Sequence, residues 1–323
     1  MARSCSRRQR YKKSWKTSSF PAKQVRIDTL LQPQKDKKIN KMKKLTLDEI
    51  RGLELELLDA FTKLCEQNDI YFTLGGGTLL GAIRHQGFIP WDDDIDVMMP
   101  RPDYERLFHP EDLDLTGFPD YMEFKSYRDG SLNYPFIKLV DTRTFVDFPY
   151  YDNETNVNQI WMDIFPIDGN PEDKKENRRI YEKSLRLRKL IFIKLAKKGE
   201  GKTLLKKVLK PAVIAGLKVA MPMPRLLKKI DDLSMSIPYD STPYVGCIMW
   251  GYGPRERMSR RKFMIPVKVP FEGRMMNAPS NYDHYLRGLY HDYMQLPPVE
   301  KRIMHGMDAW LLEPGETKED IVP

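Results

Sequence analysis

Four aspartates lie close together in the stretch Trp-Asp-Asp-Asp-Ile-Asp-Val. Asp92, Asp94 and Asp96 are two residues apart, so on a β-strand they would project from one face. Ile95 and Val97 would then point the other way, into a core. Like charges on one face repel each other unless a cation lies between them, and Mg²⁺ is a hard ion that prefers carboxylate oxygens together with substrate phosphates. We therefore predict that these three acids hold Mg²⁺ or Mn²⁺ for a phosphate ligand.

A glycine run precedes the acids by one short helix. Gly75, Gly76 and Gly77 end an expected strand, and Thr78 is expected to begin the helix. Such a turn directs backbone N–H groups and the positive end of a helix at an anion, so these four residues are predicted to bind the phosphates of a donor. Each feature alone is a weak signal, because acidic runs are mostly solvated loops and glycine runs are common. Together, in this order, they resemble the nucleotidyltransferase superfamily, in which the turn grips phosphates and the acids bind metal.

Two further residues are candidates for the same site. Asp163 is the only charged residue between Ile160 and Ile167, and a buried acid needs a partner, so we predict it as a third catalytic carboxylate beside Asp94 and Asp96. Lys138 would add a positive charge beside the phosphate, although the sequence is equally compatible with a lysine that faces the surface.

Three segments resemble the LicD family. The stretch LGGGTLLGAIRHQGFIPWDDDIDVMMPR (74–101) is similar to the family signature, and WMDIFPIDG (161–169) and FEG…YLRGLYHDYMQLPP…KRIMHG (271–306) are similar to its later motifs. The resemblance runs in order over most of residues 43–306. It implies a nucleotidyltransferase-like fold and the transfer of a phosphorylated alcohol, typically phosphocholine, from a CDP-activated donor such as CDP-choline. The acceptor would be a sugar hydroxyl of a cell-surface glycan such as lipopolysaccharide, teichoic acid or capsule.

Carried onto this chain, the resemblance assigns the metal to Asp94 and Asp96, the donor phosphates to the glycine turn, and the role of third acid to Asp163. The eukaryotic relatives fukutin and fukutin-related protein are similar in this core and use CDP-ribitol. One position departs from the family pattern, because members commonly have Gly where this chain has His291. This departure leaves the transferred alcohol and the acceptor open.

The surrounding pattern predicts an α/β or α+β fold with a small mixed sheet flanked by helices. A capping box formed by Thr46 and Glu49 predicts the start of the first helix. The expected helices cover 47–67, 78–84 and a C-terminal segment from about Ser280, and the expected strands cover 70–74, 94–99, 122–127, 135–140, 144–148, 160–165, 244–253 and 263–273.

The positive charge is unevenly distributed. Of the formal net charge of +9, residues 1–41 carry +11, which leaves −2 for residues 42–323. Residues 174–230 alone carry +16. We expect residues 1–41 to be a disordered basic leader, with an organelle transit peptide as the alternative. Residues 42–323 are expected to form the catalytic domain, with a basic helical insertion at about 172–235.

Cysteine usage and hydropathy bear on the location. Cys5, Cys65 and Cys247 lack the spacing of a disulfide framework or a structural zinc site. The chain contains no apolar run of about 18 residues, so no membrane-spanning helix is expected. We therefore expect a cytoplasmic protein, placed at the inner face of the membrane if the insertion binds lipid. Residues 174–230 mix basic and apolar residues as interfacial helices do, so they would either contact an anionic membrane that carries a lipid-linked acceptor or form a solvated helical face.

Three other classes of protein share part of these features. A nucleotidyltransferase that joins NMP to a small molecule or to RNA has the same glycine turn and D-x-D pattern. A basic nucleic-acid-binding protein would explain the charge, but most of that charge lies in the leader and the insertion, so no nucleic-acid partner is expected. A GT-A glycosyltransferase uses D-x-D, yet does not predict three glycines one helix upstream.

Overall fold

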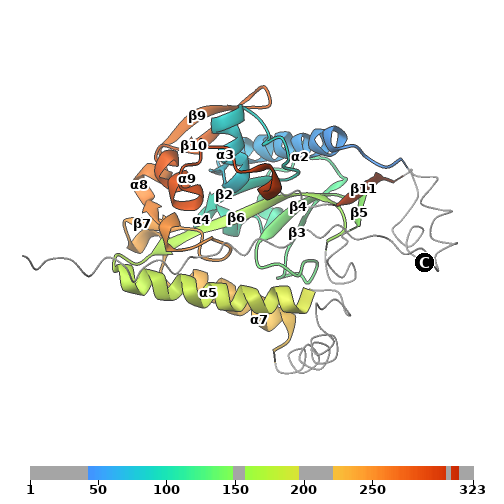
Figure 1. The fold of residues 1–323 in the computed structure, drawn as a ribbon. Helices are drawn as coiled ribbons and strands as arrows, with labels where there is room; N and C mark the ends of the chain where they lie inside the picture. The colour runs from blue at the N-terminus through green and yellow to red at the C-terminus, as the bar shows by residue number, and fades with distance from the viewer. Residues whose placement is uncertain (1–42, 148–156, 196–220, 303–306, 313–323) are drawn as a thin grey trace, which may run out of the picture. The chain divides into compact units, whose positions relative to one another are not determined.

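The computed structural model describes residues 43–147, 157–195, 221–302 and 307–312. The predicted leader at 1–41 lies outside these residues, as does the middle of the basic insertion. Within the described residues, the fold is a central mixed sheet with helices on both sides (Figure 1).

Helix α2 (Leu47–Gln67) begins at the predicted capping box. The Glu49 amide donates to Thr46 Oγ1 at 3.3 Å, and the Thr46 amide donates to Glu49 Oε2 at 2.9 Å. The apolar face of the helix packs against the sheet and buries Leu57 and Phe61 completely. The prediction of this helix from its capping residues and apolar spacing is therefore confirmed.

The central sheet of the described residues has seven strands and mixes parallel with antiparallel pairs. Strands β2 and β6 are parallel, and the other neighbours are antiparallel. In spatial order the strands are β1 (Thr73–Leu74), β2 (Ile95–Pro100), β6 (Ile160–Asn170), β4 (Ile137–Asp141) and β3 (Met122–Lys125), with β7 (Tyr244–Gly246) and β8 (Met258–Ser259) added beside β6. The predicted fold class, an α+β core with a small mixed sheet, is confirmed.

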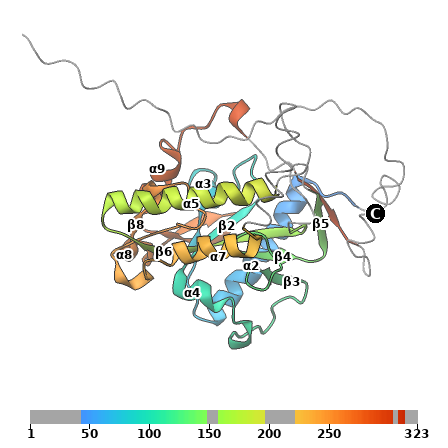
Figure 2. The same cartoon turned by 90° about the horizontal axis from the view of Figure 1, so that it is seen from below.

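Helices cover both sides of this sheet. Figures 1 and 2 show α2 and α3 (Gly76–His85) on one side, and α5 (Lys174–Leu195) and α7 (Met223–Ser234) packed together on the other. The remaining described helices are α4 (Arg101–Arg106), α8 (Arg260–Phe263) and α9 (Tyr282–Tyr290), with short 3-10 turns at Pro110–Asp112, Tyr239–Ser241, Pro254–Glu256 and Val299–Lys301. Of the described helices, none is both long enough and apolar enough to cross a membrane.

Several predicted boundaries differ from the structure. Helix α3 begins at Gly76, two residues before Thr78, because the Leu79 amide already donates to the Gly75 carbonyl at 2.8 Å. Strand β5 (Thr144–Asp147) exists but pairs with β11 (Asp308–Leu311) and stays outside the central sheet.

The predicted sheet segments near the C-terminus also differ. Of residues 244–253, only 244–246 form a strand, since the chain forms a turn at 248–250 and Gly253 has a φ of 149°. The predicted strand at 263–273 is in fact the first half of a hairpin, in which β9 (Pro266–Phe271) pairs with β10 (Arg274–Pro279).

A group of charged residues, of which Arg101, Asp168 and Asp231 are buried, joins α7 (Met223–Ser234) to the sheet. We call Arg101, Glu105, Arg128, Asp168 and Asp231 the arginine cluster. Arg101 donates to both carboxylate oxygens of Asp168 on β6, at 2.7 and 2.9 Å, and to Asp231 on α7 at 3.0 Å. Arg128 donates to Asp231 at 2.9 Å and also to Glu105. Because Asp231 is almost fully buried, α7 is part of the packed domain.

Candidate active site

Three carboxylates meet at the start of strands β2 and β6. Each of Asp94, Asp96 and Asp163 offers one oxygen that lies within 4.8 Å of the other two. Asp96 and Asp163 are direct partners in the parallel register, so their side chains share one face of the sheet. Asp94 precedes β2 and joins them from the preceding turn. We call these three residues the acid site.

The glycine turn lies against the acids. The backbone of Gly76 has a φ of 46°, and a Cβ atom added there would overlap the Asp96 carboxylate. A Cβ on Gly77 would lie 2.7 Å from Oδ2 of Asp92. Since only glycine leaves this space, the acids can approach the first turn of α3, where helix amides have no partner within the helix and the helix dipole favours negative charge.

Hydrogen bonds fix the turn to strand β2. The Gly75 amide donates to the Asp96 carbonyl at 2.9 Å, and the Asp96 amide donates to Oγ1 of the buried Thr78 at 2.8 Å. In this structure, Thr78 therefore holds the backbone of an acid. The predicted contact of Thr78 with the donor phosphates stays a prediction.

Lys138 lies on the opposite side of Asp163 from Asp96. It is the register partner of Asp163 on β4, and its Nζ is 2.5 Å from Asp163 Oδ1. Only 6% of Lys138 is exposed, which excludes the alternative of a surface-facing lysine. Three aromatic rings surround the ammonium group, with centroids between 4.2 and 5.5 Å from Nζ: Tyr134, Phe136 and Trp161.

Helix α9 closes the other side of the glycine turn. The hydroxyl of Tyr285 accepts a hydrogen bond from the Gly76 amide at 3.3 Å. Burial holds the pKa of Tyr285 well above its usual range, so the phenol stays protonated. The sequence did not single out Tyr285, because only the tertiary fold places its hydroxyl beside the turn.

The structure thus brings together most of the predicted site residues. Asp94, Asp96 and Asp163 converge, Gly75, Gly76 and Gly77 border them, and Lys138 contacts Asp163. Asp92 lies beside Gly77 and is not a member of the converging group.

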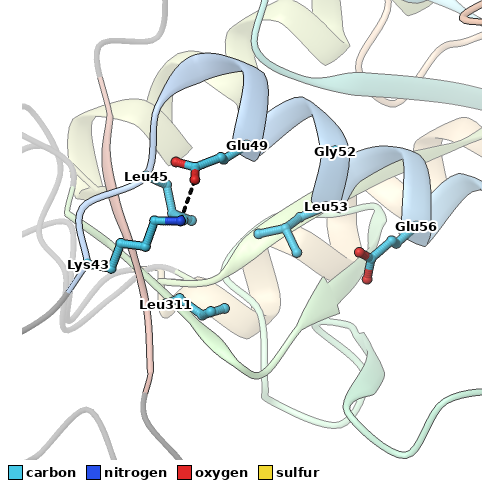
Figure 3. Close-up of a pocket in the computed structure, with 7 residues that line it drawn as sticks. All are labelled: Lys43, Leu45, Glu49, Gly52, Leu53, Glu56 and Leu311. Carbon is cyan, nitrogen blue, oxygen red and sulfur yellow. Dashed lines mark ion pairs between the residues drawn. The ribbon is translucent and has the colours of Figure 1, made fainter.

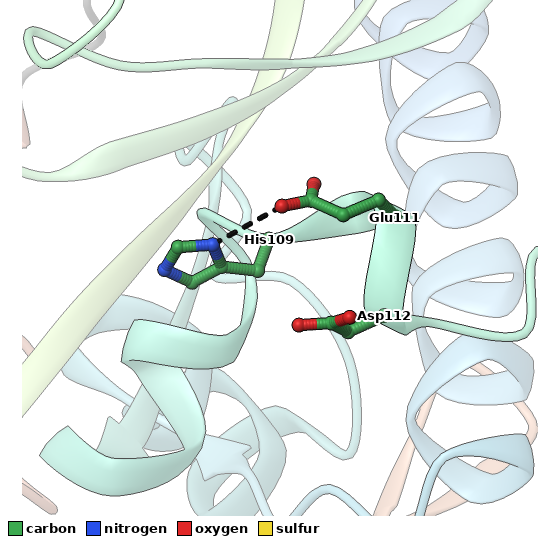
Figure 4. Close-up of side chains that lie close together, drawn as sticks. All are labelled: His109, Glu111 and Asp112. Carbon is green, nitrogen blue, oxygen red and sulfur yellow. Dashed lines mark hydrogen bonds and ion pairs between the residues drawn. The ribbon is translucent and has the colours of Figure 1, made fainter.

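A second cluster with metal-ligand residue types is found on the surface. His109, Glu111 and Asp112 also lie within 4.8 Å of one another, but all three are exposed (Figure 4). Two surface depressions of the described residues lie away from the acid site. One is lined by Lys43, Leu45, Glu49, Gly52, Leu53, Glu56 and Leu311 (Figure 3), and the other by Glu105, Arg106, His109, Asp112 and Leu113. Neither contains a residue of the acid site, so both are separate from it.

A mixed sheet whose neighbouring strands bring acids beside a glycine turn is consistent with a nucleotidyltransferase-like fold. Residues 69–175 match the family model described as LicD/FKTN/FKRP, nucleotidyltransferase domain. Over 276 residues, 84% of this chain and the whole of the relative, the chain is 33% identical to the lipopolysaccharide cholinephosphotransferase LicD of Haemophilus influenzae.

Shorter matches reach two uncharacterized proteins of Rickettsia typhi and Rickettsia prowazekii. Each is 42% identical over 57 residues, which are 17% of this chain and 18% and 21% of the relatives. The chain belongs to the LicD family, and it is a transferase of the LicD type.

Proposed function

We propose that this chain transfers phosphocholine from CDP-choline to a sugar hydroxyl of lipopolysaccharide or another cell-surface glycan. Two findings support the proposal. A cholinephosphotransferase of lipopolysaccharide is 33% identical to the chain over 84% of the chain and the whole of that relative. The main structural support is the convergence of Asp94, Asp96 and Asp163 beside the glycine turn. Transfer from a diphosphate donor needs its negative charge to be neutralised, and carboxylates placed in this way can hold a metal ion that does so.

The residues present fit a divalent metal ion. The converging groups are all carboxylates, which are the hard oxygen ligands that Mg²⁺ and Mn²⁺ prefer. We propose that Asp94 and Asp96 hold the ion, with Asp92 beside Gly77 and with Asp163 as the third acid that converges on the same point. When bound, the ion would offset the negative charge of the donor diphosphate.

The proposed reaction is a single displacement at phosphorus. The acceptor hydroxyl oxygen attacks the phosphorus that carries choline, a new O–P bond forms, and the P–O bond to CMP breaks as CMP leaves with the bridging oxygen. We assign Asp163 to orient the acceptor hydroxyl and take its proton, and Lys138 to hold Asp163 in place. The amides of the first turn of α3, together with Gly75, Gly76 and Gly77, are assigned to the donor phosphates.

The test is release of CMP from a panel of CDP-alcohols by the purified chain with Mg²⁺ or Mn²⁺. We expect turnover of CDP-choline that is lost on chelation and restored when metal is added back. Asp94→Asn should abolish CMP release, whereas Asp112→Asn, the same change in the exposed cluster, should not. Full turnover by Asp94→Asn, or attachment of NMP to an acceptor with release of pyrophosphate from a nucleoside triphosphate, would contradict the proposal.

We also propose that the basic insertion at 174–230 contacts an anionic membrane at the cytoplasmic inner face, where a lipid-linked acceptor would be reached. Residues 196–220 lie outside the described part of the chain, so the support comes from α5 and α7. Their exposed basic residues are Lys174, Lys175, Arg178, Arg179, Lys183, Arg186, Lys189, Arg225, Lys228 and Lys229. Each such residue near an anionic surface contributes about 1 kcal/mol to binding.

Flotation with anionic vesicles tests this proposal. We expect salt-sensitive binding that the double substitution Arg186→Glu and Lys189→Glu weakens. Absence of binding at low salt would contradict the proposal.

A further inference from the structure

The segment 86–94, which we call the approach loop, leads from α3 to β2 and carries Asp94 into the acid site. Of the three converging acids, Asp96 lies on β2 and Asp163 on β6, whereas Asp94 precedes the first residue of β2. The register of the sheet therefore places two of the acids. The position of the third depends on how the backbone of the approach loop is held.

Arg51 on α2 binds the approach loop from 41 residues away in the sequence. Its Nε and Nη2 donate to the Asp92 carbonyl at 3.1 and 2.8 Å, and Nη2 also donates to the Ile89 carbonyl at 2.9 Å. The Asp92 amide donates to the same Ile89 carbonyl at 2.8 Å, which closes a turn over residues 89–92. The planar guanidinium thus joins both ends of this turn and fixes the backbone two residues before Asp94.

Arg51 is itself held in place by the elements around it. Its side chain is 17% exposed, and its guanidinium lies 5.1 Å from the centroid of the Phe88 ring. Phe88 packs on Phe271 with centroids 5.1 Å apart, and the Phe88 amide donates to Oε1 of Glu272 at 2.9 Å. The approach loop is therefore held between α2 and the β9–β10 hairpin.

The backbone beyond Asp94 is held as well. Thr78 accepts a hydrogen bond from the Asp96 amide at 2.8 Å. Asp94 thus lies midway between the Asp92 carbonyl, which Arg51 binds, and the Asp96 amide, which Thr78 binds. A backbone fixed on both sides of a residue has few conformations open to it, so the Asp94 carboxylate is presented to the other acids at little further cost in entropy.

We propose that Arg51 is a positioning residue, which holds the backbone at Asp92 so that the Asp94 carboxylate is directed at the metal ion. The inference rests on the metal site of the proposed function and adds a residue of α2 that touches neither the ion nor the substrate in that proposal. Groups that orient a metal ligand from behind typically account for a 10- to 100-fold difference in metal affinity.

The experiment measures Mn²⁺ binding to the purified chain by electron paramagnetic resonance of the free ion, counting the binding that Asp94→Asn removes. Arg51→Met keeps a long side chain over Phe88 but cannot donate to the carbonyls. We expect it to bind Mn²⁺ about tenfold more weakly and to need about tenfold more Mn²⁺ for half-maximal CMP release from CDP-choline. Its kcat at saturating Mn²⁺ should fall by a smaller factor, whereas a merely structural defect would lower kcat and leave the Mn²⁺ midpoint unchanged.

Arg257 provides a matched control. It donates to the carbonyls of Pro171 and Glu172, at 2.7 and 2.8 Å, and lies 4.2 Å from the centroid of the Tyr244 ring. These contacts follow the end of β6, whereas Asp163 lies near its start. Arg257→Met and Arg51→Met should both lower the melting temperature by a few degrees, but Arg257→Met should bind Mn²⁺ as the wild type does.

Wild-type Mn²⁺ affinity in Arg51→Met, or an equal loss in Arg257→Met, would overturn the inference. If Arg51→Met does not fold, Arg51→Lys decides, since its ammonium lacks the fork that spans both carbonyls: weaker Mn²⁺ binding supports the inference and wild-type binding refutes it. Failure of the proposed function is distinguishable. A chain that binds Mn²⁺ and loses affinity in Arg51→Met, yet releases no CMP from CDP-choline, would refute the proposed reaction and support the inference. A wild-type chain that binds no Mn²⁺ would refute both.

Discussion

Strand β6 carries two buried aspartates with opposite surroundings. Asp168 is 1% exposed, and Arg101 donates to both of its oxygens, so the arginine cluster closes it off from any ligand. Asp163 lies five positions earlier on the same strand, where it converges with the half-buried Asp94 and Asp96 beside a glycine turn. The two acids differ in how their charge is balanced. Arg101 binds both oxygens of Asp168 as a fork, whereas Asp163 pairs with Lys138 through Oδ1 and also converges with two further carboxylates, a group whose summed negative charge favours a divalent cation.

The largest effect is expected when one acid of the acid site is neutralised, because this tests whether these acids serve catalysis and not stability. Asp96→Asn keeps the shape of the side chain but removes a charge that we assign to the metal. CMP release should fall by about 10³-fold, which corresponds to about 4 kcal/mol of transition-state stabilisation. The melting temperature should stay the same or rise, because repulsion between converging carboxylates is relieved. Loss of folding with normal turnover of the folded fraction would reverse the comparison.

The same substitution in the arginine cluster should have the opposite consequence. Asp168→Asn leaves the buried Arg101 without its main counter-charge, and breaking a buried ion pair in this way costs about 3–5 kcal/mol of stability. Denaturant unfolding should show this loss, while CMP release per folded molecule stays near the wild-type value. If Asp168→Asn abolished turnover with stability intact, the arginine cluster would have to be counted as part of the active site.

Two Gly→Ala substitutions, one in the glycine turn and one on the exposed side of α2, test whether the backbone of the turn matters for catalysis. Gly76→Ala would place a Cβ atom on the Asp96 carboxylate and strain a backbone with φ of 46°, so we expect CMP release to fall by about 10²-fold. Gly52 lies on the exposed side of α2 with no atom within 4 Å of an added Cβ. Gly52→Ala should therefore stabilise the chain by about 0.5–1 kcal/mol with unchanged turnover. Equal activity of the two variants would show that the close fit of the turn to the acid has no catalytic role.

The sequence was informative wherever a local pattern determines the structure. The capping box predicted the start of α2, and the alternation around Ile95 and Val97 predicted a strand whose apolar side is fully buried. Asp163 was a candidate because it is a lone charge in an apolar run. All of these signals lie within a few residues of each other, so no knowledge of the tertiary fold was needed.

Contacts between distant segments could not be predicted in the same way. The pairing of Lys138 with Asp163 depends on the register between β4 and β6. Arg101 meets Asp168 and Asp231 from 67 and 130 residues away in the sequence. Such partners follow from how strands align and helices pack, and one sequence leaves many alignments open. The boundary errors have a related cause, because Gly76 starts a helix in a conformation that three glycines in a row do not specify.

The smallest expected effect concerns His291, the position at which the sequence resemblance leads us to expect glycine. The residue ends α9 with φ of 62° and ψ of −110°, a conformation that favours glycine. His291→Gly should therefore stabilise the chain by about 1 kcal/mol, or about 2 °C in melting temperature. His284 lies inside α9, so His284→Gly should destabilise it by a similar amount, and the two variants form a matched pair with opposite signs. If His291→Gly instead lowered stability, or raised the KM for the acceptor with stability gained, the histidine would be retained for its contact with Arg255 or with the acceptor, and the end of α9 would belong with the acid site.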